Sequence, residues 1–365
     1  MELFEYIKTY NYTFEEKPFN EVDNVILSML AYADYENIVS NNRHDKKRLE
    51  IVADEYYENK DRFRIREIIP AKVAVKVLKA VKTSPRFKDL LVYNYEYLGD
   101  DTTQFSALTF ESDNFIYIAY EGTDALISGW EEDFKMSYTF PVPAHKKAIK
   151  YLKKYTFSKK KIILGGHSKG GNLAIVAAMF TNYFLNKKIV KIYSNDGPGL
   201  RLRESESARY KKISNKIIHI MPQNTIVGVL FTRDKKNDVV IKSNALPGFS
   251  HDASSWKIDK DSFVRTTLNK GCKILDESLY KWLLKYNYED RKHFIDDVFN
   301  ILKQNNIVTL YQIMEKPMTI VTLIRASSKL TDKTRIMFND FTSMLSAAKK
   351  EYKWKDLLLY LWVLL

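Results

Sequence analysis

The stretch that most constrains this 365-residue chain is Gly166-His167-Ser168-Lys169-Gly170, which matches the pattern G-x-S-x-G. In this pattern a serine occupies a sharp turn between a strand and a helix, with its hydroxyl exposed above a sheet. The flanking segments fit, because residues 160–165 form a short apolar run and residues 171–185 carry apolar side chains at helical spacing. The sequence therefore predicts a nucleophile elbow at Ser168, although a plain glycine-rich strand–helix turn would have the same pattern.

Strand and helix patterns alternate around this turn, which predicts an α/β fold. The predicted strands are 90–98, 104–110, 114–120, 160–165, 188–194, 215–222 and 238–243. The predicted helices include 20–31, capped by Asn20 or Asp23, one that opens at Ile69-Pro70-Ala71, and 144–155, 171–185 and 201–212. After Trp256 the alternation stops, and from about residue 261 to 365 the pattern is helical, for example at 278–285, 291–305, 310–314 and 338–350. We therefore expect a first domain over 1–262 and a helical C-terminal region over 263–365, which could cover the sheet or the site.

Composition narrows the functional classes. The formal net charge is +13, but the lysines are spread along the chain and there is no zinc-ligand set or RNA-recognition signature, so nucleic-acid binding is not expected. Loose attraction to an anionic membrane surface is compatible with this charge. The single cysteine, Cys272, excludes an internal disulfide and has no metal-site spacing around it.

The two ends of the sequence bear on localisation. The start, Met1-Glu2-Leu3-Phe4-Glu5, has neither the basic region nor the apolar core of a signal peptide. Residues 356–365 are strongly apolar but about half as long as a membrane span, which indicates a packed final helix or an interfacial anchor. We expect a soluble, cytoplasmic protein.

Three segments supply candidate partners for Ser168. Gly122-Thr123 follows a buried strand and is a candidate oxyanion corner, where a backbone N–H and the threonine hydroxyl could both donate; a simple turn is the alternative. Asp196 ends another buried strand, where ligands bind in open α/β sheets, but it also suits a turn before Gly197-Pro198. His251 lies on a polar loop after the last strand, where the base of such a fold would lie, although loop histidines are usually surface residues.

Two other histidines are not assigned to the site. His145 lies at a helix start, which is typical of a capping or surface residue. His219 lies in the middle of a strand, which favours a buried, hydrogen-bonded side chain over a base.

Taken together, these segments resemble the class 3 (fungal-type) lipases and, more closely, the Mbeg-like proteins, an uncharacterised bacterial family related to them. The resemblance covers about residues 20–260, and the helical tail also resembles that bacterial family. It is carried by the elbow 166–171, by Tyr120-Glu121-Gly122-Thr123 with Trp130 and Asp133 downstream, by Asn195-Asp196-Gly197-Pro198 and by His251. The resemblance implies an α/β-hydrolase-like, mostly parallel sheet flanked by helices, and a serine hydrolase that acts on a lipid or other acyl ester. No metal or cofactor is implied.

One departure from the lipase pattern concerns the acid of the triad. The lipases carry it in an Asp-x-Val segment, where this chain has Thr225-Ile226-Val227, and a threonine cannot stabilise an imidazolium as a carboxylate does. Asp196 is the best substitute, Asp252 is less suited because it neighbours the histidine, and Asp234 is a third option.

The implied mechanism makes Ser168 the nucleophile, His251 the general base and Asp196 the residue that orients it, with the backbone N–H groups of Thr123 and Lys169 as oxyanion donors. Three alternatives stay open. One is a thioesterase or peptidase with the same machinery. The second is a weakened or inactive hydrolase fold that serves as a binding or scaffold protein, which the threonine at 225 favours. The third is a basic membrane-surface protein that uses the helical tail.

Overall fold

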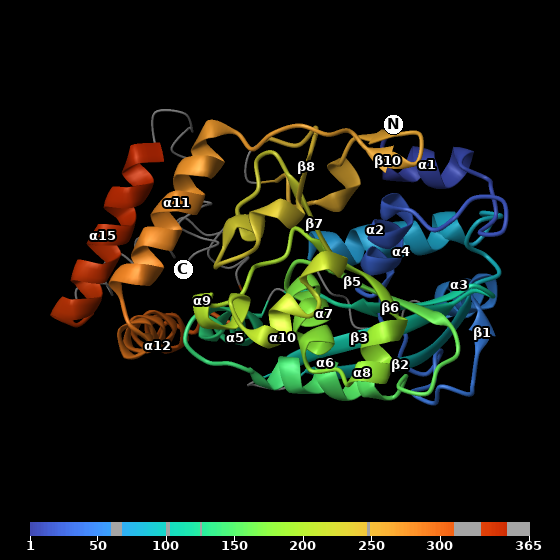
Figure 1. Ribbon diagram of the computed structural model, residues 1–365, viewed down its shortest axis with the longest axis horizontal. Helices are drawn as coiled ribbons and strands as arrows, with labels where there is room; N and C mark the ends of the chain where they lie inside the picture. The colour runs from blue at the N-terminus through green and yellow to red at the C-terminus, as the bar shows by residue number, and fades with distance from the viewer. Residues whose placement is uncertain (60–67, 100–102, 125, 247–248, 310–329, 349–365) are drawn as a thin grey trace.

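In the computed structural model, the described residues (1–59, 68–99, 103–124, 126–246, 249–309 and 330–348) form an eight-stranded sheet between two layers of helices (Figure 1). Figure 1 also shows a separate group of helices, α11, α12 and α15, at the left end of the molecule. This arrangement confirms the predicted α/β-hydrolase-like fold class with a C-terminal helical appendage.

The strands lie side by side in the order of the sequence. They are β1 (Lys47–Arg48), β2 (Leu91–Gly99), β3 (Gln104–Glu111), β4 (Phe115–Tyr120), β5 (Lys161–His167), β6 (Ile189–Asn195), β7 (Ile217–Pro222) and β8 (Asp238–Ile241). Pairing is antiparallel from β1 to β4 and parallel from β4 to β8. The carboxyl ends of β4 to β8 therefore meet at one edge, where ligand sites of open parallel sheets form.

Helices cover both faces of the sheet because each has one apolar side to bury. One face packs against α1 (Leu3–Thr9), α2 (Glu21–Leu30), α3 (Leu49–Glu58) and α4 (Ile69–Val81). The other packs against α6 (Pro143–Lys153), α7 (Lys169–Met179), α8 (Tyr183–Lys188) and α10 (Ala208–Lys211), and the short α9 (Leu202–Ser205) contacts α10. The predicted cap is confirmed at α2, where the Asn20 side chain accepts from the N–H groups of Val22 and Asp23.

Two predicted helices are each divided in the structure. The helix expected over 171–185 ends at Met179, and α8 begins after Asn182, whose side chain accepts from Leu185 N at 2.9 Å. The helix expected over 201–212 is likewise two short helices, and Ser207 caps the second. In both places a polar side chain starts a new helix where apolar spacing alone predicts continuity.

The C-terminal region packs on the end of the sheet that carries the strand ends. Helices α11 (Lys270–Lys285), α12 (Tyr288–Gln304) and α15 (Asp332–Ala348) share an apolar cluster with α5 (Ile127–Lys135) and the loop 226–229. Arg233 binds Asp238 of β8 and Asp276 of α11 through its guanidinium, which ties α11 to the sheet.

The start of the C-terminal region differs from its predicted structure. The purely helical pattern expected from 261 onward is wrong at its start, because β9 (Ile258–Asp259) and β10 (Ser262–Phe263) pair as a small hairpin. Segments 310–314 and 356–365 lie outside the described residues, and the boundary between residues 262 and 263 stays a prediction. Within the described part of the chain, no helix has the length and apolar character that spanning a bilayer requires.

Candidate active site

Ser168 stands at a sharp turn between β5 and α7, as the elbow pattern predicts. Its backbone has φ 58° and ψ −134°, a left-handed conformation that non-glycine residues rarely adopt. The turn is packed tightly, since a Cβ added at Gly170 would lie 2.1 Å from the Tyr120 carbonyl oxygen. Such strain persists only where the surroundings impose it, and it holds the serine side chain at the edge where the strands end.

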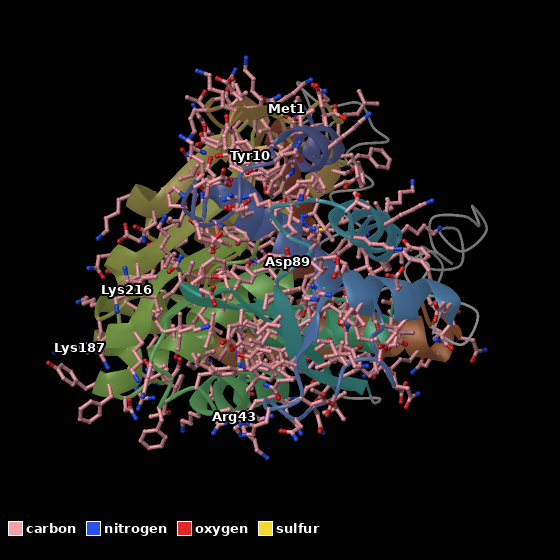
Figure 2. All side chains as sticks on the ribbon, turned by 90° about the vertical axis from the view of Figure 1, so that its right-hand side faces the viewer. Met1, Tyr10, Arg43, Asp89, Lys187 and Lys216 are labelled. Atoms are coloured by element: carbon pink, nitrogen blue, oxygen red, sulfur yellow. The ribbon has the colours of Figure 1, made fainter. Side chains whose placement is uncertain are left out.

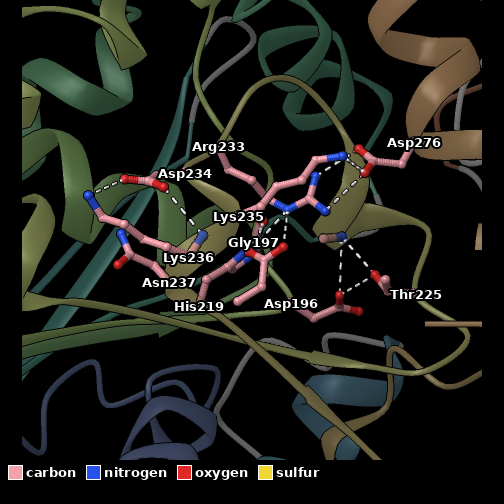
Figure 3. Close-up of polar contacts among 12 residues, drawn as sticks. Asp196, Gly197, His219, Thr225, Arg233, Asp234, Lys235, Lys236, Asn237 and Asp276 are labelled. Atoms are coloured by element: carbon pink, nitrogen blue, oxygen red, sulfur yellow. Dashed lines mark hydrogen bonds and ion pairs between the residues drawn. The ribbon is translucent and has the colours of Figure 1, made fainter. Parts of the chain in front are cut away.

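His251 and Asp196 form a hydrogen-bonded pair. His251 Nδ1 lies 2.7 Å from Asp196 Oδ2, and the aspartate is fully buried at the end of β6. The other carboxylate oxygen accepts from the Thr225 hydroxyl and, at 3.1 Å, from Gly228 N–H (Figure 3). Donors on one carboxylate oxygen leave the other oxygen facing the His251 ring, so the carboxylate is held in a fixed orientation.

The other two acids weighed from the sequence serve their own loops. Asp252 accepts from Ser254 N–H at 2.9 Å, and Asp234 accepts from Lys236 N–H and pairs with the Lys236 ammonium at 2.8 Å. Neither makes an interaction with His251 in the described part of the chain. The structure therefore brings Asp196, and not these two, to the histidine.

His167, the second residue of the elbow motif, holds the His251 loop in place. Its Nε2 lies 2.8 Å from the His251 carbonyl oxygen, and its Nδ1 lies 2.9 Å from the Tyr32 hydroxyl. The two imidazole rings are 4.4 Å apart between centroids. Burial lowers the pKa of His167 to about 3, so the ring is neutral, donates through Nε2 and accepts at Nδ1. The sequence analysis assigned neither Tyr32 nor His167 to the site. Only His167 could have been found from the sequence, because it lies within the elbow motif.

Ser168 and His251, the candidate nucleophile and base, are not joined by a hydrogen bond. Within the described residues, no hydrogen bond joins Ser168 Oγ to His251. His251 is nonetheless held against the elbow, through its contacts with His167. Such bonds are often long in ligand-free sites and tighten when substrate binds.

The predicted oxyanion corner lies against Ser168. A Cβ added at Gly122 would lie 3.0 Å from Ser168 Cβ and 2.7 Å from the His167 carbonyl oxygen. The hydroxyl of Thr123 donates to Asp133 Oδ2, so it is not the second free donor that the sequence predicts. The backbone N–H of Lys169, in the first turn of α7, has no acceptor within its own helix.

A buried charge cluster that sequence reasoning missed lies below this corner. The Lys169 ammonium is 2.7 Å from Glu132 Oε2 and 3.1 Å from Asp133 Oδ1. Burial raises the pKa of Asp133 to about 6, although Lys169 opposes this shift. Burial alone would lower the pKa of Lys169, but Asp133 and Glu132 raise it above its usual value. The lysine therefore stays charged and holds the carboxylate that binds Thr123.

An apolar pocket opens beside Ser168. The core supplies Trp130, Phe134, Met136, Leu230 and Phe231, and the C-terminal helices supply Leu279, Trp282, Leu283, Phe294 and Ile295. Ser168 and Lys169 lie in its lining with few other polar groups. A pocket of this kind suits a hydrocarbon chain with its polar end at the serine.

Comparison with known proteins places the chain within a family. The family model described as Mbeg1-like matches residues 81–300, which is more than half of the chain and confirms the predicted family. No curated protein sequence matches the chain.

Similar solved structures include three lipases. The Rhizomucor miehei lipase propeptide complex is 15% identical, with 46% of this chain and 60% of that chain covered and a TM-score of 0.30. The lipase of Rhizopus microsporus var. chinensis is 16% identical, with 43% and 63% covered and a TM-score of 0.26. M37 lipase is 13% identical, with 70% and 78% covered and a TM-score of 0.30. The chain thus spans less than two thirds of the first two lipases, and we infer function from the site itself.

Proposed function

We propose that this chain, which belongs to the Mbeg1-like family, is a serine hydrolase that cleaves a lipid or other acyl ester. The observation that carries the proposal is the His251–Asp196 pair at 2.7 Å beside a strained Ser168 that lines an apolar pocket. Activated serine nucleophiles need an adjacent base that a third group orients.

In the proposed reaction, Ser168 Oγ attacks the ester carbonyl carbon while His251 Nε2 takes the hydroxyl proton. Asp196 accepts from His251 Nδ1–H and stabilises the imidazolium that forms. The backbone N–H groups of Thr123 and Lys169 donate to the oxyanion. His251 then gives its proton to the leaving alcohol, and a water molecule activated by the same histidine hydrolyses the acyl-enzyme.

The pocket supports an acyl ester over a peptide. Its walls offer aromatic and aliphatic surface, whereas a peptide backbone would need hydrogen-bonding groups along its length. An acyl chain in the pocket would place its carbonyl group at Ser168. A thioester of the same acyl chain would fit equally well, so thioesters belong among the substrates to be tested.

One observation favours the second candidate, an inactive hydrolase fold that serves as a binding protein. Ser168 Oγ makes no hydrogen bond with His251 in the described part of the chain, and a nucleophile that is never activated would look the same. Thr225 argues against decay of the acid, since its hydroxyl donates to Asp196 and so supports the substitute carboxylate.

The deciding experiment is labelling with a fluorophosphonate probe, followed by a panel of acyl esters and thioesters. We expect the wild type to be labelled, Ser168→Ala and His251→Ala to lose labelling, and hydrolysis to follow the same order. A folded wild-type protein that neither reacts with the probe nor hydrolyses any member of the panel would refute the hydrolase and support the binding protein.

A further inference from the structure

The positive charge of this chain is concentrated in one segment. Between residues 134 and 195 the sequence has thirteen lysines and neither an aspartate nor a glutamate, although acidic residues number 45 over the whole chain. This segment forms α6, α7 and α8. Such an asymmetry indicates an anionic partner for the surface that the segment builds.

Most of these lysines reach solvent without a carboxylate beside them. Lys154 and Lys160 pair with Glu96 and Glu111. By contrast, the lysines on the outer side of α6 and after it are exposed, and none forms an ion pair with a described carboxylate; they are Lys146, Lys147, Lys150, Lys153, Lys159 and Lys161. The charge of this surface is therefore largely uncompensated.

Three exposed aromatic rings lie among these charges. Phe157 is 88% exposed, Phe184 is 70% exposed and Tyr183 is 60% exposed. The Lys188 ammonium donates to the Thr156 carbonyl oxygen at 3.2 Å, which ties the turn that carries Phe157 to α8. The rings therefore belong to one surface, and exposed apolar groups that gather on one surface and are rimmed by polar residues mark interaction sites.

The figures place this surface on one side of the molecule. α6 and α8 lie along the lower edge of Figure 1. After the quarter turn to Figure 2, Lys187 of α8 lies at the lower left. We call the surface formed by α6, the turn 154–161 and α8 the basic aromatic face.

We propose that the basic aromatic face binds the surface of a membrane that contains anionic lipids. Lysines near such a surface are attracted to the lipid phosphates, and aromatic rings between them enter the headgroup region. Rings as exposed as Phe157 protrude, which suits insertion among headgroups. A single-stranded nucleic acid, in contrast, stacks its bases on rings along a charged groove.

The test is sedimentation of the full chain with vesicles of phosphatidylcholine, alone or mixed with phosphatidylglycerol. We expect binding only to the anionic vesicles, weakened by salt. The triple variant Lys146→Gln, Lys147→Gln and Lys150→Gln should weaken binding by about ten- to a hundredfold, since each lysine near an anionic surface contributes roughly fivefold. The matched control is Lys72→Gln, Lys76→Gln and Lys79→Gln on α4, which removes three exposed lysines from the opposite face of the sheet.

The aromatic contribution is tested with Phe157→Ser combined with Phe184→Ser, which should weaken vesicle binding without changing the charge. Binding should persist in Ser168→Ala, which separates it from the proposed hydrolysis. Equal losses in the α6 and α4 variants, or no binding to anionic vesicles, would overturn the proposal. The proposal would also be overturned if an oligonucleotide displaced the protein from the vesicles and bound more weakly to the same α6 and aromatic variants. That result would assign the face to nucleic acid.

Discussion

Thr225 illustrates how an uncharged residue can support a carboxylate that lies on another segment. It carries no carboxylate, but its hydroxyl donates to Asp196, which pairs with His251 from the end of β6. Gly228 N–H binds the same carboxylate oxygen. In the proposed site, His251 is therefore oriented by a small network and not by a single side chain.

This network gives the first prediction. Asp196→Asn keeps the shape but removes the charge that stabilises the His251 imidazolium, so kcat should fall on the order of 10³- to 10⁴-fold. Thr225→Val removes one hydrogen-bond donor to the Asp196 carboxylate and should lower kcat about tenfold. The measurement is ester hydrolysis or the rate of phosphonate labelling. Asp252→Asn, next to the histidine, should react at the wild-type rate, and a loss there comparable with that of Asp196→Asn would contradict the assignment.

His145 supports a second prediction, on pH. The ring is buried behind the elbow helix, accepts from Val142 N–H at 3.1 Å and lies 2.7 Å from Asn172 Oδ1. The predicted cap is therefore present, but the side chain is not at the surface. Burial lowers the pKa of His145 to about 3, from an ordinary value of 6.5. The unfolded chain then binds the extra proton below pH 6.5, so the stability from the neutral ring is present above pH 6.5 and is lost as the pH falls towards 3.

The measurement is the free energy of unfolding in denaturant between pH 4 and pH 6. Each such histidine should add a slope of about 1.4 kcal/mol per pH unit, so His145→Gln should flatten the curve by that amount. Asn172→Ala removes the hydrogen-bond partner but keeps the titrating ring, and should lower stability without flattening the curve. Identical slopes for the wild type and His145→Gln would show that this ring does not titrate on unfolding in that range.

Helix α11 illustrates how one element is fixed to another through charge. Arg233 is largely buried between Asp238 of β8, 3.1 Å away, and Asp276 of α11, 2.9 Å away (Figure 3). The position of α11 matters because it forms part of the pocket wall beside Ser168. Its attachment to the sheet should therefore control how firmly that wall is held.

The third prediction tests this attachment. Asp276→Ala leaves Arg233 buried with only Asp238, and should lower the free energy of unfolding by about 2 kcal/mol, below the 3–5 kcal/mol of a fully broken buried pair. Hydrogen exchange should rise in α11 and stay unchanged in α6. Asp234→Ala breaks the more exposed pair with Lys236, visible in the same figure, and should cost less than about 1 kcal/mol. Equal effects of the two variants would mean that the buried pair does not secure α11.

Over the whole molecule, the sequence predicts features that depend on local order. Ser168 and Asp196 follow buried strands directly, and parallel strands bring their ends together, so their meeting could be expected. The Tyr32–His167 contact could not be expected, because the two residues lie 135 positions apart in the sequence and meet only through the packing of the segment after α2. The amphipathic pattern of α11 indicates that one side is buried, but not that it faces a pocket at Ser168.

The last prediction follows from this placement of α11. Leu283 lines the pocket, whereas its neighbour Leu284 is 56% exposed and lies outside it. Leu283→Trp should fill part of the space for an acyl chain, and differences of a methylene or more in an apolar pocket change specificity by roughly 10- to 200-fold. We expect kcat/KM for a dodecanoyl ester to fall by about that factor while the value for an acetyl ester changes little.

Leu284→Trp is the matched control, since it adds the same side chain one position away on the outer side of the helix. It should leave the ratio of the two kcat/KM values as in the wild type. A ratio that falls equally in both variants would mean that the added bulk acts through the stability of α11. An unchanged ratio in Leu283→Trp would mean that the acyl chain lies elsewhere, and that the C-terminal helices cover the site without selecting its substrate.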